Sequence, residues 1–171
     1  NNMVGPETRA DGREAQELRE LALERGVLGR ADGSARWSQG KTTVLAAVFG
    51  PRNQGVTAAG RGDLDPEKMV LEVVFKPASG LKTATGLALE QQLRGALASV
   101  VLAAQHPRTV LTVVLQEVCD DGSLWACALN AASAALVDAG VPLRALLAAV
   151  TCSAASDREG AAGAGAGARA G

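Results

Sequence analysis

Short runs of apolar, β-branched residues constrain the fold of this chain more than any other feature. Three such runs cover residues 42–49, 69–75 and 109–118, and turn-forming residues border each of them. Because β-branched side chains fit the pleated surface of a sheet, we expect three strands. Residues 33–39 are expected to pair with the first of these strands through a turn at Gly40, which would form a hairpin.

Two stretches with helical spacing interrupt the strands. Between residues 83 and 105, apolar residues recur every three or four positions, and the pattern stops before Pro107. A second, alanine-rich helix is expected over residues 123–138, with Ser123 as its N-cap and Gly140 as its stop. Both helices are expected to pack on the sheet.

A last apolar run, residues 146–152, predicts a final strand. The element order is then β-β-β-α-β-α-β, which is typical of an α+β layer fold. We expect a flexible N-terminus over residues 1–8 and one domain over residues 9–156. Residues 157–171, rich in Gly and Ala, are expected to form a disordered tail, because they cannot bury enough apolar surface to offset the entropy of ordering.

Charge and cysteine usage limit the function classes. The formal net charge of −1 gives no overall attraction to nucleic acid or membrane, so any RNA contact must be local. The aromatic content of 2% is too low for base-stacking platforms. Cys119, Cys127 and Cys152 form no C-x-x-C pair, which argues against a disulfide framework or a zinc site. We expect a soluble, intracellular protein that needs no metal or cofactor.

Seven motifs occur in a fixed order between Arg9 and Ser153. They are R-A-D-G-R followed by L-R, D-G-S-A followed by G-K-T, V-F-G-P-R, H-P-R-T, V-V-L-Q, D-G-S and A-L-V-D-A-G-V-P. Each motif is weak alone, but together they resemble the ribonuclease PH family, and in particular the ring subunits of the eukaryotic RNA exosome.

The resemblance implies a ribonuclease PH-like (ribosomal protein S5 domain 2-like) fold that is C-terminally incomplete in this chain. It implies other ribonuclease PH-like subunits as partners in a hexameric ring, S1/KH cap subunits, and RNA, with no role at a membrane. The implied function is to support 3′-to-5′ RNA processing and degradation, including rRNA maturation and mRNA turnover, by assembly and RNA threading. The implied location is the nucleus and nucleolus, and also the cytoplasm.

Departures from the family pattern argue against catalysis. Trp125 stands where active members carry an arginine that holds the attacking phosphate, and an indole has no charge and only one donor. Ala84 and Thr85 stand where active members carry further arginines. The acidic pair of active members lies beyond the matched stretch. We therefore expect no catalytic residues, and a degenerate phosphate site at Ser123, Leu124 and Trp125.

Four arginines are the candidate RNA-binding residues. Arg52 and Arg61 lie in or beside the long loop between two strands, where family members face the channel. Arg94 and Arg108 are further candidates, although solvated or subunit-interface arginines explain them equally well. The alternative to a non-catalytic subunit is an independent 3′-to-5′ exoribonuclease or nuclease, either phosphorolytic or hydrolytic.

Other motifs favour structural roles. Residues 35–42 match a relaxed phosphate-binding loop, but a strand is expected after them instead of the helix that such a loop requires. Asp120 and Asp121 are expected to act as helix caps rather than metal ligands. Cys127 is expected to be a small core residue. Trp125 is either a core aromatic residue or a plug that fills the former phosphate pocket.

Overall fold

The fold is seen in a computed structural model that describes residues 12–14, 17–53, 67–81 and 84–152. Three predictions lie outside these residues: the flexible segment 1–8, Arg61 and the Gly/Ala tail 157–171.

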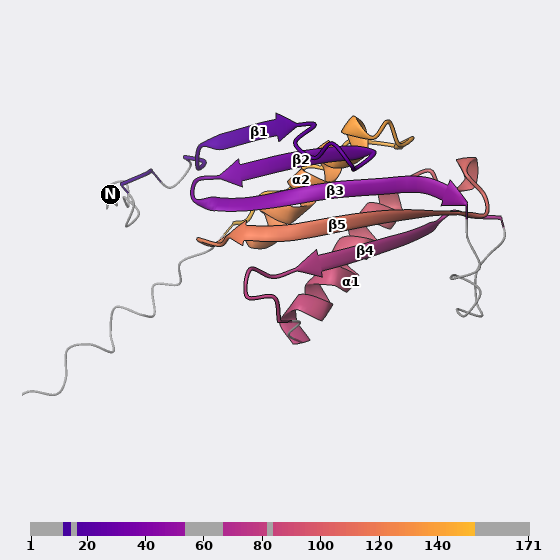
Figure 1. Ribbon diagram of the computed structural model, residues 1–171. Coiled ribbons are helices and arrows are strands. Elements are labelled where there is room, and N and C mark those ends of the chain that lie inside the picture. Colours follow the sequence, from indigo (N-terminus) through magenta and orange to yellow (C-terminus); the bar gives the residue numbers. More distant parts are fainter. Residues whose placement is uncertain (1–11, 15–16, 54–66, 82–83, 153–171) are drawn as a thin grey trace, which may run out of the picture.

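A five-stranded sheet forms one layer of the molecule, in the order β1-β2-β3-β5-β4 (Figure 1). All neighbouring strands are antiparallel except β4 and β5, which run parallel. The strands are β1 (Leu21–Arg25), β2 (Gly33–Gln39), β3 (Thr42–Asn53), β4 (Val70–Lys76) and β5 (Thr109–Cys119).

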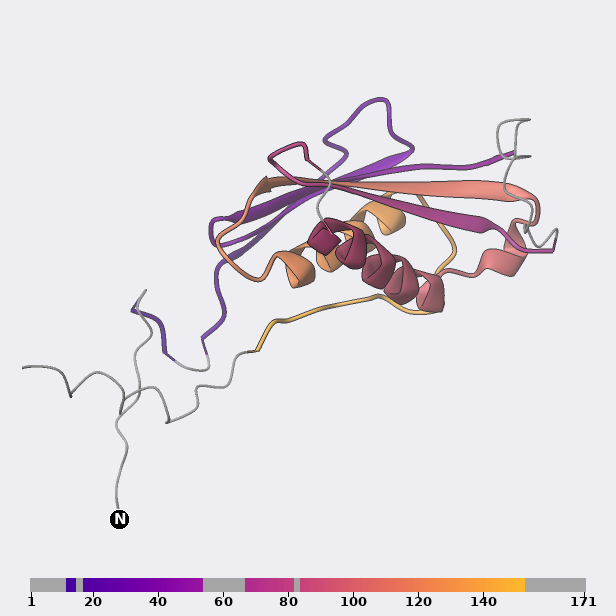
Figure 2. The ribbon, with the colours of Figure 1, turned by 90° about the horizontal axis from the view of Figure 1, so that it is seen from below.

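Two helices, α1 (Ala84–Val100) and α2 (Leu124–Asp138), cover one face of this sheet (Figure 2). Because parallel strands need a crossover connection, α1 and the short 3-10 helix η2 (Ala103–Gln105) join β4 to β5. The α+β layer fold expected from the element order is confirmed, and so is the β2–β3 hairpin.

The core lies between the sheet and the helices. Alternate residues of β3, β4 and β5 point toward the helices and are buried, as the two-residue period of a strand requires. Leu93 and Leu97 are the residues of α1 that are buried in this core. Small residues allow α2 to approach β2 so closely that a Cβ atom added at Gly33 would overlap the backbone of Ala135 and Ala139.

The predicted strand over residues 146–152 is wrong. This segment is extended but has no neighbouring strand among the residues that the structure describes. The amide of Asn130 on α2 instead exchanges two hydrogen bonds with the backbone of Ala149, and Oγ of Ser133 accepts one from the N–H of Leu147. Side chains of α2 thus bond backbone groups of this segment that a neighbouring strand would bond in a sheet.

The strand β1 was not predicted from the sequence. All five of its residues are exposed, including Leu21 and Leu23. A strand at the edge of a sheet that buries no side chain leaves little burial pattern in the sequence. The segment pairs with β2 in a continuous antiparallel register.

Candidate phosphate site and arginine clusters

The loop in front of α2 is held by two distant parts of the chain. Oγ1 of Thr42 donates to the carbonyl of Gly122 (2.7 Å) and accepts from the N–H of Asp121 (2.9 Å). The guanidinium of Arg19 donates to the carbonyls of Asp121 (2.8 Å) and Gly122 (3.2 Å). These bonds fix the loop that leads into Ser123, whose φ of 66° lies in the left-handed region.

The prediction that Ser123 is the N-cap residue of α2 is confirmed. Its side chain, however, makes no capping hydrogen bond. Asp120 accepts the N–H of Gly122 (2.8 Å), so it closes the turn before the helix rather than capping the helix itself. The described part of the chain holds no group of three or more possible metal ligands.

Trp125 joins the first turn of α2 to α1. Its Nε1 donates to Oε1 of Gln92 at 2.8 Å, and the residue is 36% exposed, so it is not a core aromatic residue. This arrangement leaves a neutral ring at the position that the resemblance assigns to a phosphate-binding arginine. Ala84 and Thr85, in the first turn of α1, are both exposed.

Cys127, on α2, is a small, buried core residue, as predicted. Its thiol is within hydrogen-bonding distance of the carbonyls of Trp37 (3.4 Å) and Thr42 (3.7 Å). Burial raises the pKa of the Cys127 thiol to about 11. The protonated thiol is therefore not suited to act as a nucleophile near neutral pH.

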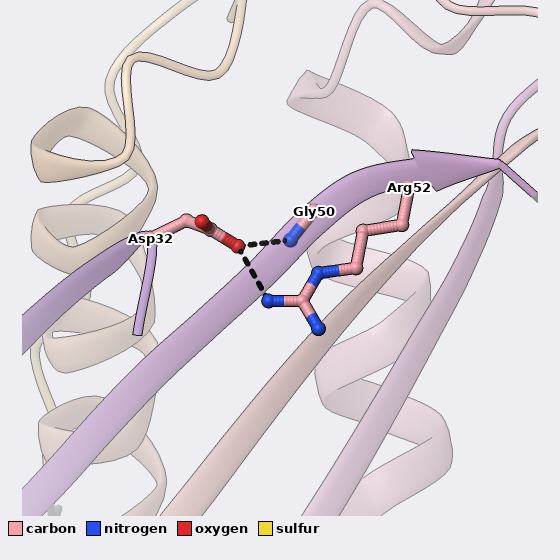
Figure 3. Close-up of polar contacts among 3 residues, drawn as sticks. All are labelled: Asp32, Gly50 and Arg52. Carbon is pink, nitrogen blue, oxygen red and sulfur yellow. Dashed lines mark hydrogen bonds and ion pairs between the residues drawn. The ribbon is translucent and has the colours of Figure 1, made fainter. Parts of the chain in front are cut away.

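Arg52 belongs to a compact polar cluster near the end of β3 (Figure 3). Oδ2 of Asp32 accepts the N–H of Gly50 (2.8 Å) and Nη2 of Arg52 (3.2 Å). The hydrogen bond from Gly50, aided by Arg52, lowers the pKa of the Asp32 carboxyl below its ordinary value of 3.8. The guanidinium of Arg52 also lies 5.6 Å from the ring centroid of Phe49.

The other candidate arginines are not all in one place. Asn53 and Thr109 are paired at the end of the β3–β5 ladder, so Arg108 is at the same end of the sheet as Arg52. Arg108 is exposed and has a φ of 58°. Arg94 is an exposed residue in the middle of α1. The structure thus brings Arg52 and Arg108 to one end of the sheet and leaves Arg94 on the helix.

Sequence reasoning missed four residues that build these sites. Arg19 and Thr42 occur in the L-R and G-K-T motifs, which could have marked them as structural partners of the loop before α2. Asp32 begins the D-G-S-A motif. Gln92 carries no sequence signal, because its role depends on the packing of α1 against α2.

Comparisons with known proteins identify the family of this chain. Residues 17–142 match the 3′ exoribonuclease family, domain 1. The exosome complex exonuclease RRP46 homologue of Oryza sativa subsp. japonica is 46% identical over 153 residues, covering 90% of this chain and 62% of the relative. The Arabidopsis thaliana homologue is 44% identical over 144 residues, covering 84% of this chain and 58% of the relative.

A solved structure extends the likeness to the fold. The crystal structure of rice Rrp46 is 47% identical and aligns with a TM-score of 0.75 over 81% of this chain and 64% of that structure. The chain spans about three fifths of the length of the relatives that it matches. None of the helices in the described residues has the length and apolar character needed to cross a membrane.

Proposed function

This chain belongs to the 3′ exoribonuclease (ribonuclease PH) family, and we propose that it serves as a non-catalytic ring subunit of the RNA exosome, the counterpart of exosome component five. In this role it supports 3′-to-5′ RNA processing and degradation, including rRNA maturation and mRNA turnover, by assembling with other subunits and guiding RNA. The similarity to the two plant RRP46 homologues supports this assignment.

The observation that carries the non-catalytic part of the proposal is the environment of Trp125. A phosphorolytic centre must hold an anionic phosphate with charge-assisted hydrogen bonds. Here the only side-chain donor at the corresponding position is an indole N–H, which is already bonded to Gln92. The neighbouring cation, Arg19, is held to the loop before α2 by bonds from its Nη1 to two backbone carbonyls.

The proposed partners are other ribonuclease PH-like subunits in a hexameric ring, together with S1/KH cap subunits and RNA. Exposed apolar side chains support an assembling surface: Leu21 and Leu23 on the edge strand β1 are 48% and 46% exposed. Leu146 and Val150 are exposed too, on the segment that has no neighbouring strand in the described part of the chain. We further propose that the assembly acts in the nucleus and nucleolus and also in the cytoplasm.

A thermal denaturation series tests the assembly. The full chain should unfold at a higher temperature when a second ribonuclease PH-like exosome subunit is added, because binding stabilises the folded state by mass action. At a partner concentration of one hundred times Kd, the gain should reach about 2.7 kcal/mol. No shift with any ring subunit, combined with a stable monomer alone, would count against the proposal.

RNA contact is proposed for Arg52, Arg61, Arg94 and Arg108. If these arginines bind phosphates only, affinity should fall steeply with salt and vary little with RNA sequence. Replacing Arg52 and Arg61 by alanine should weaken binding of a long RNA to the assembled ring and leave assembly intact. Dissociation of the ring, without a change in RNA affinity of what remains assembled, would assign these arginines to an interface.

An independent 3′-to-5′ exoribonuclease or nuclease, phosphorolytic or hydrolytic, is the second candidate. The observation that favours it is that the two plant relatives carry the word exonuclease in their names. The two functions differ in one measurable property, the release of nucleotides from RNA. A phosphorolytic enzyme releases nucleoside diphosphates and requires phosphate, whereas a hydrolytic enzyme does not require it.

A further inference from the structure

Asp32 is anchored to β3 by both its backbone and its side chain. Its N–H donates to the carbonyl of Val48 (2.9 Å), and its Oδ2 accepts the N–H of Gly50 (2.8 Å). The same oxygen accepts Nη2 of Arg52 at 3.2 Å (Figure 3). Asp32 is thus a fixed acceptor whose place is set by the sheet, and the side chain of Arg52 reaches back along β3 to meet it.

Phe49 provides a second contact for the same guanidinium. The ring centroid of Phe49 lies 5.6 Å from Cζ of Arg52, a distance suited to a cation–π contact. Arginine has five N–H donors, and Asp32 uses one of them. A long and otherwise mobile side chain is therefore held at two points, with donors left over for a bidentate partner.

We propose that Asp32 is a positioning residue that holds the guanidinium of Arg52 ready for an RNA phosphate. The inference rests on the proposed contact between Arg52 and RNA. A side chain that is already ordered loses less rotamer entropy when it binds, so the contact gains affinity. The carboxylate also repels a phosphate, but both side chains are exposed to solvent, where salt and water weaken that repulsion. The ordering effect should therefore dominate.

The ordering of Arg52 by Asp32 and the repulsion between Asp32 and a phosphate predict opposite results for Asp32→Ala. Binding of fluorescein-labelled poly(U) to the full chain in its assembled ring is measured by fluorescence anisotropy at fixed salt. Asp32→Ala should weaken binding about threefold to tenfold, although it removes a negative charge. Asp32→Asn should restore most of the affinity, because an amide oxygen can still accept from Gly50 and Arg52. Asp32→Ala combined with Arg52→Ala should bind no more weakly than Arg52→Ala alone.

A matched control removes the same charge elsewhere on the sheet. Glu24 on β1 forms an exposed ion pair with Arg36 on β2 (3.7 Å), so Glu24→Ala changes the net charge as Asp32→Ala does. This control should bind RNA as well as, or slightly better than, the unchanged protein. If Asp32→Ala does not fold, Phe49→Leu replaces it, because it removes the ring beneath Arg52 and keeps an apolar side chain; it too should weaken binding.

Three outcomes would reject either the positioning role of Asp32 or the contact between Arg52 and RNA. Tighter binding by Asp32→Ala would show that Asp32 shields Arg52 from RNA instead of positioning it. Unchanged binding by Asp32→Ala, or by Phe49→Leu if that variant replaces it, while Arg52→Ala weakens it, would also reject the positioning role. Unchanged binding by Arg52→Ala would reject the proposed contact between Arg52 and RNA itself, and the inference with it.

Discussion

The indole Nε1 of Trp125 donates a hydrogen bond to Oε1 of Gln92 at 2.8 Å, and this bond links the first turn of α2 to α1. The bond gives the ring a structural partner at the position that the resemblance assigns to a phosphate-binding arginine. The tryptophan is thus part of the contact between the two helices.

The bond between Trp125 and Gln92 should contribute modestly to stability. Gln92→Ala and Trp125→Phe each remove it and should lower the free energy of unfolding by about 0.5–1 kcal/mol, at the low end for a neutral, partly exposed bond. The double variant should lose less than the sum of the two. Urea denaturation measures these values, with Gln91→Ala, at an exposed neighbouring position on α1, as the control. Strict additivity would show that the two side chains are not coupled.

Gly33 should be intolerant of any side chain. A Cβ atom there would overlap the backbone of Ala135 in α2 and of Ala139 directly after it, so Gly33→Ala should lower the free energy of unfolding by about 2 kcal/mol or more. Gly29→Ala is the matched control, because a Cβ atom at Gly29 meets nothing within 4 Å. That control should stay within about 0.5 kcal/mol of the unchanged protein. Equal effects in the two variants would contradict the close packing of β2 against α2.

The three thiols should react at very different rates. Cys119 and Cys152 are exposed, whereas Cys127 is buried with its pKa raised to about 11. A chromogenic disulfide reagent near neutral pH should therefore label the two exposed cysteines rapidly, and Cys127 only as the protein unfolds. Peptide mass mapping identifies the labelled sites. Rapid labelling of Cys127 in the folded protein would show that the packing between α2 and the sheet opens easily.

The stability of the fold should depend on pH through the ionisation of the Asp32 carboxyl. Its pKa in the folded protein is lowered below 3.8, chiefly by the hydrogen bond from Gly50. The carboxylate therefore stabilises the fold above its unfolded pKa, and this contribution is lost as the pH falls through the lower folded pKa. Asp32→Asn should melt at a lower temperature than the unchanged protein at neutral pH, and the difference should shrink toward about pH 3. A difference that is the same at both pH values would contradict the ionised role of Asp32.

The sequence predicted the elements whose side chains are buried. β3, β4 and β5 show alternating burial and α1 has a buried stripe, so their residue patterns followed from the core. β1 buries none of its residues and left no such pattern. Residues 146–150 do alternate between exposed and partly buried, but Asn130 and Ser133 provide their hydrogen bonds, and no periodicity reveals a helix acting as the partner.

The prediction of a degenerate phosphate site at Ser123 and Trp125 rests on the resemblance to the family and stays a prediction. The bond from Trp125 to Gln92 was not predictable from the motifs, because it depends on how α1 packs against α2. The same is true of Asp32, which lies 20 residues before Arg52 in the sequence and meets it only because β2 and β3 form a hairpin. Contacts of this kind come from the register of the sheet, which short motifs do not specify.

The most direct test of the account is a phosphorolysis assay on the purified, mass-verified full chain. With RNA and inorganic phosphate, the chain should release no nucleoside diphosphates, while an active family member in the same buffer should release them. Trp125→Arg alone should not create activity, because Ala84 and Thr85 still stand where the resemblance places further arginines. Phosphate-dependent release of nucleoside diphosphates by the unchanged chain, absent from a mock purification, would contradict the claim that it is a non-catalytic subunit.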